Sequence, residues 1–505
     1  MTQIPFVLAQ VVLVPLLASF ACFVLGGRAG RRVGWIAFLS LVYPALLLLS
    51  VGSGLYNGGQ AVTESYAWAP AAGLTFGFLA DGLSTPVALV MAVVCAATSV
   101  YSMPYMRHRL ESLEGGERKS QYGVYYLNFL LVVTGLLGVS LSTNLIELYL
   151  FVELMLIPTF FLLGLFGYFQ KTRIAITYFV WNQLGAFIFL VGILVAYSKT
   201  GSFAVSSLST IGTMSSIGYW VFFLVMLGWF VKMGVFGVHM WLPSAEAEPP
   251  SSFAPIMATV VGVGNYVVAR LLVQNMPVIF QTYSVPFMIV ALLTMIFGGA
   301  MTLVQDDVKY LFAWSTMSQN AYSLLGIGSL TVLGLSGGVF YFLSHILGKC
   351  ILFSVAGIVL ARTGTRDMKQ MGGLASKMPV TAVLCLLGAL VLSAVPPTSG
   401  FQAEWIMFAG IFYQGAYGVT VNLVIAILGI VATGLTVAYT FWPVRRMFFG
   451  PLPAHLEMVT EAPLTMTIPL LVLAAISILL GIYPDLVTKT LVSFASSLPA
   501  LKGGL

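Results

Sequence analysis

The hydrophobic positions of this chain gather into long apolar runs, and the alternating strand pattern of a membrane β-barrel is absent. The runs recur from one end of the chain to the other. A helix of about 20 apolar residues crosses a hydrocarbon core about 30 Å thick. The pattern predicts an all-α polytopic membrane protein with about fourteen spans, at residues 4–26, 33–53, 81–103, 123–142, 144–167, 173–197, 219–240, 252–273, 284–304, 308–328, 331–361, 379–415, 419–443 and 466–484.

Two of these runs contain residues that interrupt helices. The seventh continues into a segment with Gly234, Gly237 and Pro243, and the twelfth contains the sequence SAVPPTSGFQAEW. Proline removes a backbone hydrogen bond and kinks a membrane helix. Broken backbone at membrane depth is tolerated only where it is buried in protein or lines a wet cavity. We therefore expect two broken helices, the seventh and the twelfth.

The composition agrees with a membrane protein, because 59% of the residues are hydrophobic and only 8% are charged. A soluble domain carries about a quarter charged residues. The first run has no basic n-region and no clear cleavage site, so we expect it to be retained. All four cysteines lie inside apolar runs, which predicts neither a disulfide nor a metal site. We also expect no cofactor and no catalytic centre, because no nucleophile–base set is visible.

Basic residues are distributed unequally between the loops. Most of the 22 lysines and arginines follow odd-numbered spans, among them Arg107, Arg109, Arg366 and Arg445. The positive-inside rule then places these loops in the cytoplasm and both termini outside. The net charge of +6 is spread over short loops, so it indicates membrane topology and not a nucleic-acid partner.

A few ionisable residues lie inside the apolar runs. A charged side chain at the bilayer centre costs about 3 kcal/mol on insertion scales, and such residues usually mark ion or proton routes. The alternative is a set of structural ion pairs that hold the helices together. The residues are Glu147, Glu153, Lys232, His239, His345, Lys349 and Glu404.

The spacing of these residues along the sequence indicates which of them share a helix face and which lie near a span end. His345 and Lys349 are four positions apart and share one helix face. Lys232 and His239 are seven apart and lie on nearly one face, although the glycine-rich break lies between them. Glu147 lies near the outer end of its span, so we expect an interfacial or helix N-terminal acid there.

Glu153 lies deeper, as the one carboxylate in the apolar stretch LYLFVELMLIPTFFLLG. A carboxylate about 8 Å from a buried lysine stabilises the protonated amine by roughly 2 kcal/mol at an effective dielectric constant of about 20. Moving or neutralising that carboxylate would release a proton from the lysine. We therefore hypothesise that Glu153 sets the proton affinity of a buried lysine.

Several motifs together resemble one protein family. The resemblance covers nearly the whole chain, and the motifs occur in the family's order. It points to the antiporter-like proton-translocating membrane subunits of complex I and its relatives, with the subunit M branch the most similar. The motifs are FGFLADGLSTP, VELMLIP, VKMGVFGVHMWLP, VQDDVKYLFAWSTMSQNAY, HILGKCILFSVAG, MGGLASKMP and PPTSGFQAEW.

The resemblance implies fourteen helices with two inverted five-helix repeats, each containing one broken helix. It assigns residues 1–122 to an N-terminal segment, 123–273 and 284–447 to the two repeats, and 448–505 to the last helix and tail. The family's acid on the fifth helix falls on Glu153 and its broken-helix lysine on Lys232. The residue facing the far half-channel falls on Glu404, and His345 with Lys349 matches an eleventh-helix pattern.

The chain also departs from the family pattern. Many relatives have a lysine in the eighth helix four residues before a tyrosine, but counting back from Tyr266 gives Gly262. Where relatives read HTWLPDAH, this chain reads HMWLPSAE, with Ser244 and Glu246. The candidates to carry the route past this gap are bound water and the side chains of His239, Asn265 and His345.

These observations together predict a proton-translocating membrane-arm subunit of a complex I-like oxidoreductase in the prokaryotic inner membrane. The route would use Glu153, Lys232, His239, His345, Lys349 and Glu404. The partners would be the other membrane-arm subunits and the lipid bilayer, and the electron donor would be NADH, a reduced deazaflavin or ferredoxin. The alternatives are a subunit of a multisubunit sodium/proton antiporter or of a membrane-bound hydrogenase-type complex, and a purely structural membrane anchor.

Overall fold

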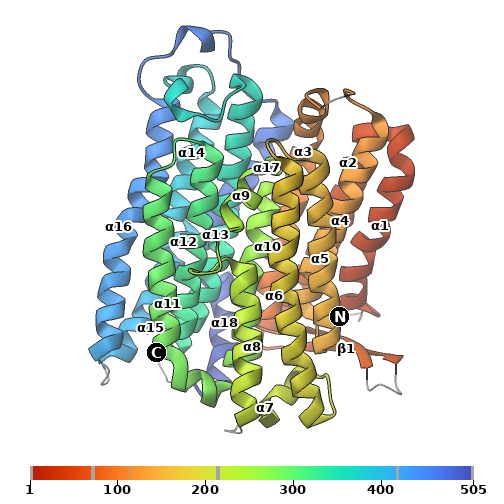
Figure 1. Cartoon of the computed structure of the whole chain (residues 1–505), viewed down its shortest axis with the longest axis vertical. Coiled ribbons are helices and arrows are strands. Elements are labelled where there is room, and N and C mark those ends of the chain that lie inside the picture. The colour runs from red at the N-terminus through yellow and green to blue at the C-terminus, as the bar shows by residue number, and fades with distance from the viewer. Residues whose placement is uncertain (1–3, 70–73, 114, 212–215, 417–419, 502–505) are drawn as a thin grey trace.

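The protein is a bundle of helices that run side by side along its longest axis (Figure 1). The computed structural model describes residues 4–69, 74–113, 115–211, 216–416 and 420–501. Within these residues, 11 helical segments are long and apolar enough to cross a membrane, the first of them containing both α1 and α2. The expected membrane architecture, built mostly of helices, is therefore confirmed.

The first part of the chain builds one side of the bundle and its middle. Its helices are α1 (Val7–Ala29), α2 (Val33–Tyr56), α3 (Ser84–Glu111), α4 (Lys119–Leu141), α5 (Leu145–Phe166), α6 (Lys171–Thr200), α7 (Leu208–Ile211), α8 (Ser216–Met233), α9 (Leu242–Ala247) and α10 (Ala254–Val267), which continues as the π-helical turn η4 (Val268–Val273).

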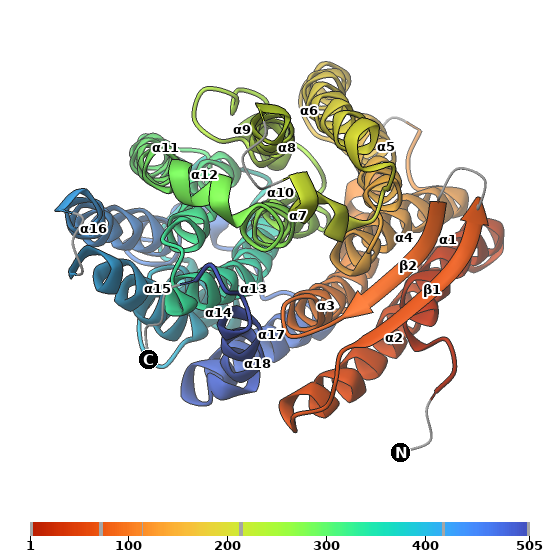
Figure 2. The same ribbon diagram turned by 90° about the horizontal axis from the view of Figure 1, so that it is seen from below.

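The second part supplies the remaining helices. They are α11 (Pro277–Leu303), α12 (Val308–Gly328), α13 (Val332–Thr363), α14 (Pro379–Leu392), α15 (Ser399–Ala416), α16 (Thr420–Phe448), α17 (Leu464–Ile482) and α18 (Asp485–Ser496). Seen from below, α10 and α13 lie in the interior of the bundle, whereas α1, α2, α6 and α16 lie at its edges (Figure 2).

The seventh predicted span is broken where glycine indicated a break. Helix α8 ends at Met233, and α9 begins at Leu242. Gly234 and Gly237 have φ values of 63° and 95°, a region that residues with a Cβ rarely adopt. The indole Nε1 of Trp241 donates a hydrogen bond to the Val231 carbonyl at 2.9 Å. This bond satisfies a carbonyl at the end of α8 that a continuous helix would have paired internally.

The twelfth predicted span is also divided into two helices. Helix α14 ends at Leu392, and α15 begins at Ser399. Ala394 in the connection has a φ of 52°, and the Thr398 hydroxyl donates to the Val395 carbonyl at 2.8 Å. The Val395 carbonyl also accepts a hydrogen bond from the Thr398 amide at 3.2 Å, so this carbonyl in the connection is paired within the turn. The second predicted break is confirmed.

A β-hairpin lies between α2 and α3, within residues 54–80, which separate two of the predicted spans. Strands β1 (Val62–Ala69) and β2 (Leu74–Ala80) pair antiparallel. The Glu64 carboxylate accepts hydrogen bonds from the first amides of α1, those of Leu8 at 3.0 Å and Ala9 at 2.9 Å. On the other strand, the amide of Gly77 donates to Oε2 of Glu147 at 3.0 Å. The hairpin therefore ties the start of α1 to the start of α5.

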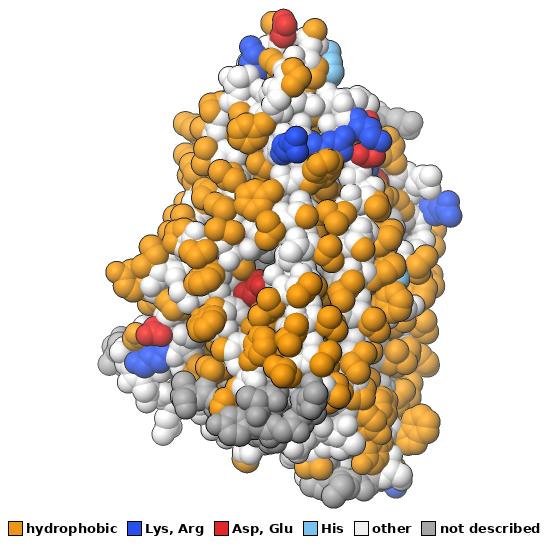
Figure 3. All heavy atoms as spheres, turned by 90° about the vertical axis from the view of Figure 1, so that its left-hand side faces the viewer, with side chains coloured by type: hydrophobic (Ala, Val, Ile, Leu, Met, Phe, Trp, Pro, Cys, Tyr) orange, Lys and Arg blue, Asp and Glu red, His pale blue; other side chains and the backbone are white. Residues whose placement is uncertain are grey.

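The outer surface is apolar over most of its height. Hydrophobic side chains cover the face shown in Figure 3, and basic side chains gather near its upper end. Large apolar side chains are strongly exposed on the outer helices, for example Trp220 and Val431 at 68% each. Such a surface is unfavourable in water and favourable in lipid. The chain is an integral membrane protein.

Candidate functional site

Five of the ionisable residues predicted inside the membrane, Glu153, Lys232, His345, Lys349 and Glu404, fall into three groups. The first joins α5, α6 and α8, the second joins α9, α12 and α13, and the third surrounds α15. Lys232, His345 and Lys349 are almost fully buried, at 4%, 2% and 0% exposure, whereas Glu153 and Glu404 are half-buried. Burial of several ionisable groups in an apolar bundle is costly, so the arrangement points to a function beyond packing.

The first group contains Glu153 and Lys232. Glu153 on α5 accepts a hydrogen bond from Nε2 of Gln183 on α6 at 3.4 Å. Lys232 lies on the last turn of α8, directly before the break, and interacts electrostatically with Glu153. The predicted acid–lysine pair is therefore brought together by helices α5 and α8.

His239 lies in the break itself and belongs to an aromatic cluster. Its ring stacks on Phe236 with 5.9 Å between centroids and contacts Phe297 and Trp314. Its Nδ1 accepts a hydrogen bond from the Gly237 amide at 3.3 Å. These ring contacts and this hydrogen bond indicate that His239 helps to hold the backbone of the break in place.

The second group is built on one turn of α12. Nζ of Lys349 donates hydrogen bonds to the Phe312 carbonyl and to Oγ of Ser315, both at 2.5 Å. The hydroxyl of Thr316, the next residue, donates to Oε1 of Glu246 at 2.8 Å. Glu246 and Lys349 interact electrostatically, and both are 0% exposed. Glu246 on α9 and Lys349 on α13 thus bind neighbouring residues of the same turn of α12.

His345 lies one turn before Lys349 on α13. The two side chains interact electrostatically, as their shared helix face predicts. Both ring nitrogens of His345 are buried, and neither has a hydrogen-bond partner among the described residues. An imidazole in this state can accept or donate a proton once a water molecule or a side chain reaches it.

The third group contains Glu404 and a set of polar neighbours that the sequence analysis did not single out. Glu404 on α15 interacts electrostatically with Tyr322, Tyr341 and Tyr439. The Tyr341 hydroxyl donates to Oε1 of Gln319 at 2.8 Å, and Nε2 of Gln319 donates to the Tyr439 hydroxyl at 2.7 Å. These uncharged polar residues extend the site across α12, α13 and α16.

Gly262 on α10 occupies the position where the family pattern places a lysine. A Cβ there would lie 2.5 Å from Cε2 of Phe342 and 3.1 Å from Oδ1 of Asn320. The space for a longer side chain is therefore filled. Nδ2 of Asn265 donates to Oδ1 of Asn320 at 3.4 Å, so two amides lie beside this glycine in place of a cation.

Further ionisable residues near the ends of helices anchor the structure. Arg270 forms two hydrogen bonds to the carboxylate of Asp81, at 2.7 and 2.8 Å, across the end of the bundle. Burial alone would raise the pKa of Asp81, but Arg270 and the amides of Ser84 and Leu83 lower it below its ordinary value. Glu147 is buried and bound to the Gly77 amide in the first turn of α5, as expected for a helix N-terminal acid.

A family model described as "NADH:quinone oxidoreductase/Mrp antiporter, TM" matches residues 142–436. An NAD(P)H-quinone oxidoreductase chain 4 from Synechococcus sp. (strain JA-3-3Ab) is 30% identical over 94% of this chain and 88% of its own length. A chain of the Mrp complex from Dietzia sp. DQ12-45-1b is 22% identical, with a TM-score of 0.86 and 98% of both chains covered.

A chain of respiratory complex I from Thermus thermophilus is 23% identical, with a TM-score of 0.82 and 96% and 99% of the two chains covered. These solved structures share the fold from end to end. The family model spans more than half of the chain, and it includes Glu153, Lys232, Lys349 and Glu404. The chain therefore belongs to the NADH:quinone oxidoreductase/Mrp antiporter transmembrane family.

Proposed function

We propose that this chain is a proton-translocating subunit of the membrane arm of a complex I-like oxidoreductase. Quinone reduction or a related reaction would occur in other subunits, and this chain would couple its energy to proton movement. The observation that carries the proposal is the series of three buried or half-buried ionisable groups, at Glu153–Lys232, Glu246–Lys349 and Glu404. Each group lies at or beside a helix break or on the buried helix α13.

In the proposed route, a proton from the basic side reaches Lys232, whose charge is stabilised by Glu153. It passes by way of water and His345 to Lys349, and leaves toward Glu404 on the opposite side. Glu246 joins the route as the acid that faces Lys349, a role that the sequence analysis did not assign. His239 bounds the first break and would guide water there.

We also infer the finer architecture of the family for this chain. Residues 123–273 and 284–447 would form two inverted five-helix repeats within fourteen helices, between an N-terminal segment at 1–122 and a last segment at 448–505. The position of one helix break in each part supports this division. The beginning of α1 and helix α18 lie toward the lower end of the bundle, opposite the end where most basic side chains of the face in Figure 3 gather, which fits termini outside the prokaryotic inner membrane (Figures 1 and 3).

The test is proton pumping by membrane vesicles that contain the whole complex with Glu153→Gln or Lys232→Ala. We expect each variant to lose most of the proton gradient. Redox turnover, measured with the same vesicles in the presence of an uncoupler, reports whether the complex is assembled. Full pumping by both variants would exclude the proposal.

The second candidate is a subunit of a multisubunit sodium/proton antiporter, because a chain of the Dietzia Mrp complex shares this fold over 98% of both chains. The two functions differ in their partners. Co-purification of iron–sulfur and quinone-binding subunits supports the oxidoreductase. Sodium-driven proton exchange by a complex without those subunits supports the antiporter.

A further inference from the structure

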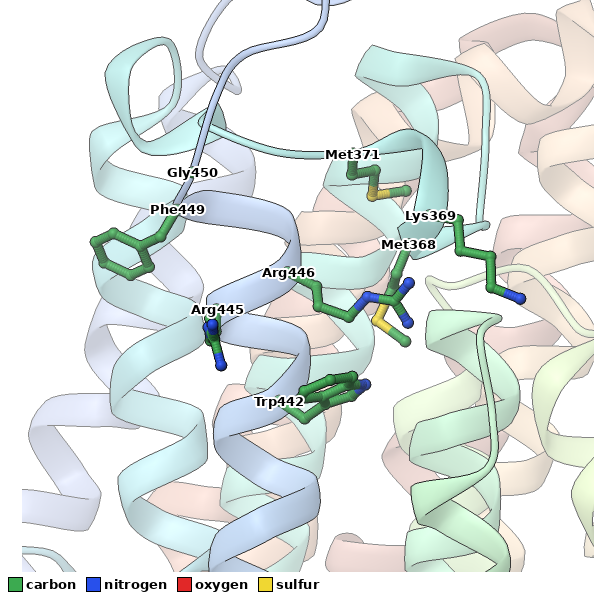
Figure 4. Close-up of a pocket in the computed structure, with 8 residues that line it drawn as sticks. All are labelled: Met368, Lys369, Met371, Trp442, Arg445, Arg446, Phe449 and Gly450. Carbon is green, nitrogen blue, oxygen red and sulfur yellow. The ribbon is translucent and has the colours of Figure 1, made fainter.

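A cavity of about 420 Å³ lies at the basic end of the bundle, apart from the three buried groups. It is formed by the short helix η5 (Met368–Gln370) with Met371 and by the end of α16. Figure 4 shows the guanidinium of Arg446 above the ring of Trp442, with Lys369 on the facing segment. The lining residues are Met368, Lys369, Met371, Trp442, Arg445, Arg446, Phe449 and Gly450.

The side chains that line the cavity carry more positive charge than the neighbouring carboxylate neutralises. Arg446 Nη1 lies 2.8 Å from Oδ1 of Asp306, and Lys369 Nζ lies 2.5 Å from its Oδ2. These hydrogen bonds hold the pKa of Asp306 below its ordinary value. One carboxylate therefore serves two cations. Arg445 forms no hydrogen bond or ion pair with any described residue, and it is exposed. The cavity is left with a positive charge that suits an anion.

The cavity also lies where the apolar surface of α16 meets the polar end of the bundle. Val431, further down the same helix, is 68% exposed, and Trp442 at the rim is 40% exposed. Tryptophan is enriched at the boundary between hydrocarbon and headgroups, and lysine and arginine extend from there toward phosphate. The Arg446 guanidinium lies 5.3 Å from the centroid of the Trp442 ring, which holds its planar fork at this boundary.

We propose that this cavity binds the phosphate headgroup of an anionic phospholipid whose acyl chains lie along α16. Guanidinium groups bind phosphate oxygens through two parallel hydrogen bonds, and the indole contacts the lipid below. The same phosphate would compete with Asp306 for Arg446 and Lys369. Binding should therefore be weakened by removing Arg445 or Arg446, and strengthened by removing the charge of Asp306.

The test uses the full chain purified from nanodiscs that contain equal amounts of phosphatidylglycerol and phosphatidylcholine. Native mass spectrometry then counts the lipids that stay bound. Each basic residue near an anionic lipid contributes about fivefold to binding. We expect Arg445→Gln to lower phosphatidylglycerol retention by about that factor, Arg445→Gln with Arg446→Gln to lower it further, and Asp306→Asn to raise it.

Arg107→Gln is the matched control, because Arg107 is an exposed arginine whose partner is Glu111 on its own helix, at 3.0 Å. The Arg445→Gln variant should fold normally, since that side chain has no described internal partner. Equal retention by Arg107→Gln and by the double variant would overturn the proposal.

A second arm separates a lipid from a soluble anion. Thermal unfolding of the detergent-purified chain is measured with inorganic phosphate and, separately, with phosphatidylglycerol. Stabilisation by the lipid alone, lost in Arg445→Gln, supports the proposal. Equal stabilisation by inorganic phosphate, lost in the same variant, would assign the cavity to soluble phosphate and overturn the lipid assignment.

Discussion

Glu246 and Lys349 bind neighbouring residues of the same turn of α12, the acid through the Thr316 hydroxyl at 2.8 Å and the base through the Ser315 hydroxyl at 2.5 Å. The two charged side chains come from different helices, α9 and α13, and neither is exposed. Oε2 of Glu246 is buried and has no hydrogen-bond partner among the described residues. One carboxylate oxygen is therefore left free to take a proton.

The variant Glu246→Gln tests whether this carboxylate carries protons. Glutamine keeps an acceptor for Thr316 and removes the ionisable group. We expect proton pumping to fall at least tenfold, and the thermal unfolding temperature of the purified complex, measured in parallel, separates this loss from a loss of stability. Glu147→Gln is the control, because Glu147 is equally buried but is bound to the hairpin. Equal pumping by the two variants would limit Glu246 to a structural role.

A double-mutant cycle tests the pairing of Glu246 with Lys349. Removing one of two buried charges that interact leaves the other uncompensated, which costs about 3–5 kcal/mol. We expect Lys349→Met to be destabilised by about this amount, and the double variant with Glu246→Gln to recover most of it. The measurement is unfolding in mixed micelles by a denaturing detergent. Strictly additive effects would show that the two side chains are not coupled.

Asp81→Asn tests the anchor between the start of α3 and η4. Asparagine keeps an oxygen for the amides of Leu83 and Ser84, but it removes the charge that balances Arg270. Because Arg270 is 4% exposed, we expect a loss of about 3–5 kcal/mol in the free energy of unfolding. A loss below about 1 kcal/mol, the usual value of an exposed pair, would contradict this assignment.

The same pair predicts a dependence of stability on pH. The pKa of Asp81 is lower in the folded chain than its ordinary value of about 3.9. Its contribution is therefore fully present above about pH 4 and is lost as the pH falls through the folded pKa. Unfolding temperatures measured from about pH 3 to pH 7 should show this acid-side loss in the native chain and a smaller one in Asp81→Asn.

Gly262→Ala tests the close packing at α10. The new methyl group would meet the Phe342 ring at 2.5 Å, and overpacking of this kind costs about 1–3 kcal/mol. Gly434→Ala is the control, because nothing lies within 4 Å of its added Cβ. Phe342→Leu should restore part of the stability lost in Gly262→Ala. Equal unfolding temperatures for Gly262→Ala and Gly434→Ala would show that the site can relax.

The helix breaks could be predicted from the sequence because glycine and proline act locally. Gly234 and Gly237 mark the first break, and Pro396 and Pro397 mark the second. The pairing of Glu153 with Lys232 followed from family resemblance and electrostatics, and the two residues do interact. The intramembrane roles of these residues remain predictions that the pumping experiments address.

Other features depend on contacts between distant segments, which a single sequence does not display. Glu246 was noted only as a departure from the family pattern, because its partner on α13 lies more than a hundred positions away. Gln319, Tyr341 and Tyr439 were missed because uncharged polar residues give no signal against an apolar background. The hairpin was missed as well, although the sequence VTESYAWA alternates between exposed and less exposed positions along most of its length.

The hydrogen bond from Trp241 to the Val231 carbonyl has a consequence for how this protein can move. It connects the end of α8 to the residue directly before α9, across the break. Straightening α8 and α9 into one helix would break this bond and leave the buried Trp241 indole N–H without its acceptor in an apolar interior. The bond therefore favours the bent arrangement of α8 and α9 beside Lys232.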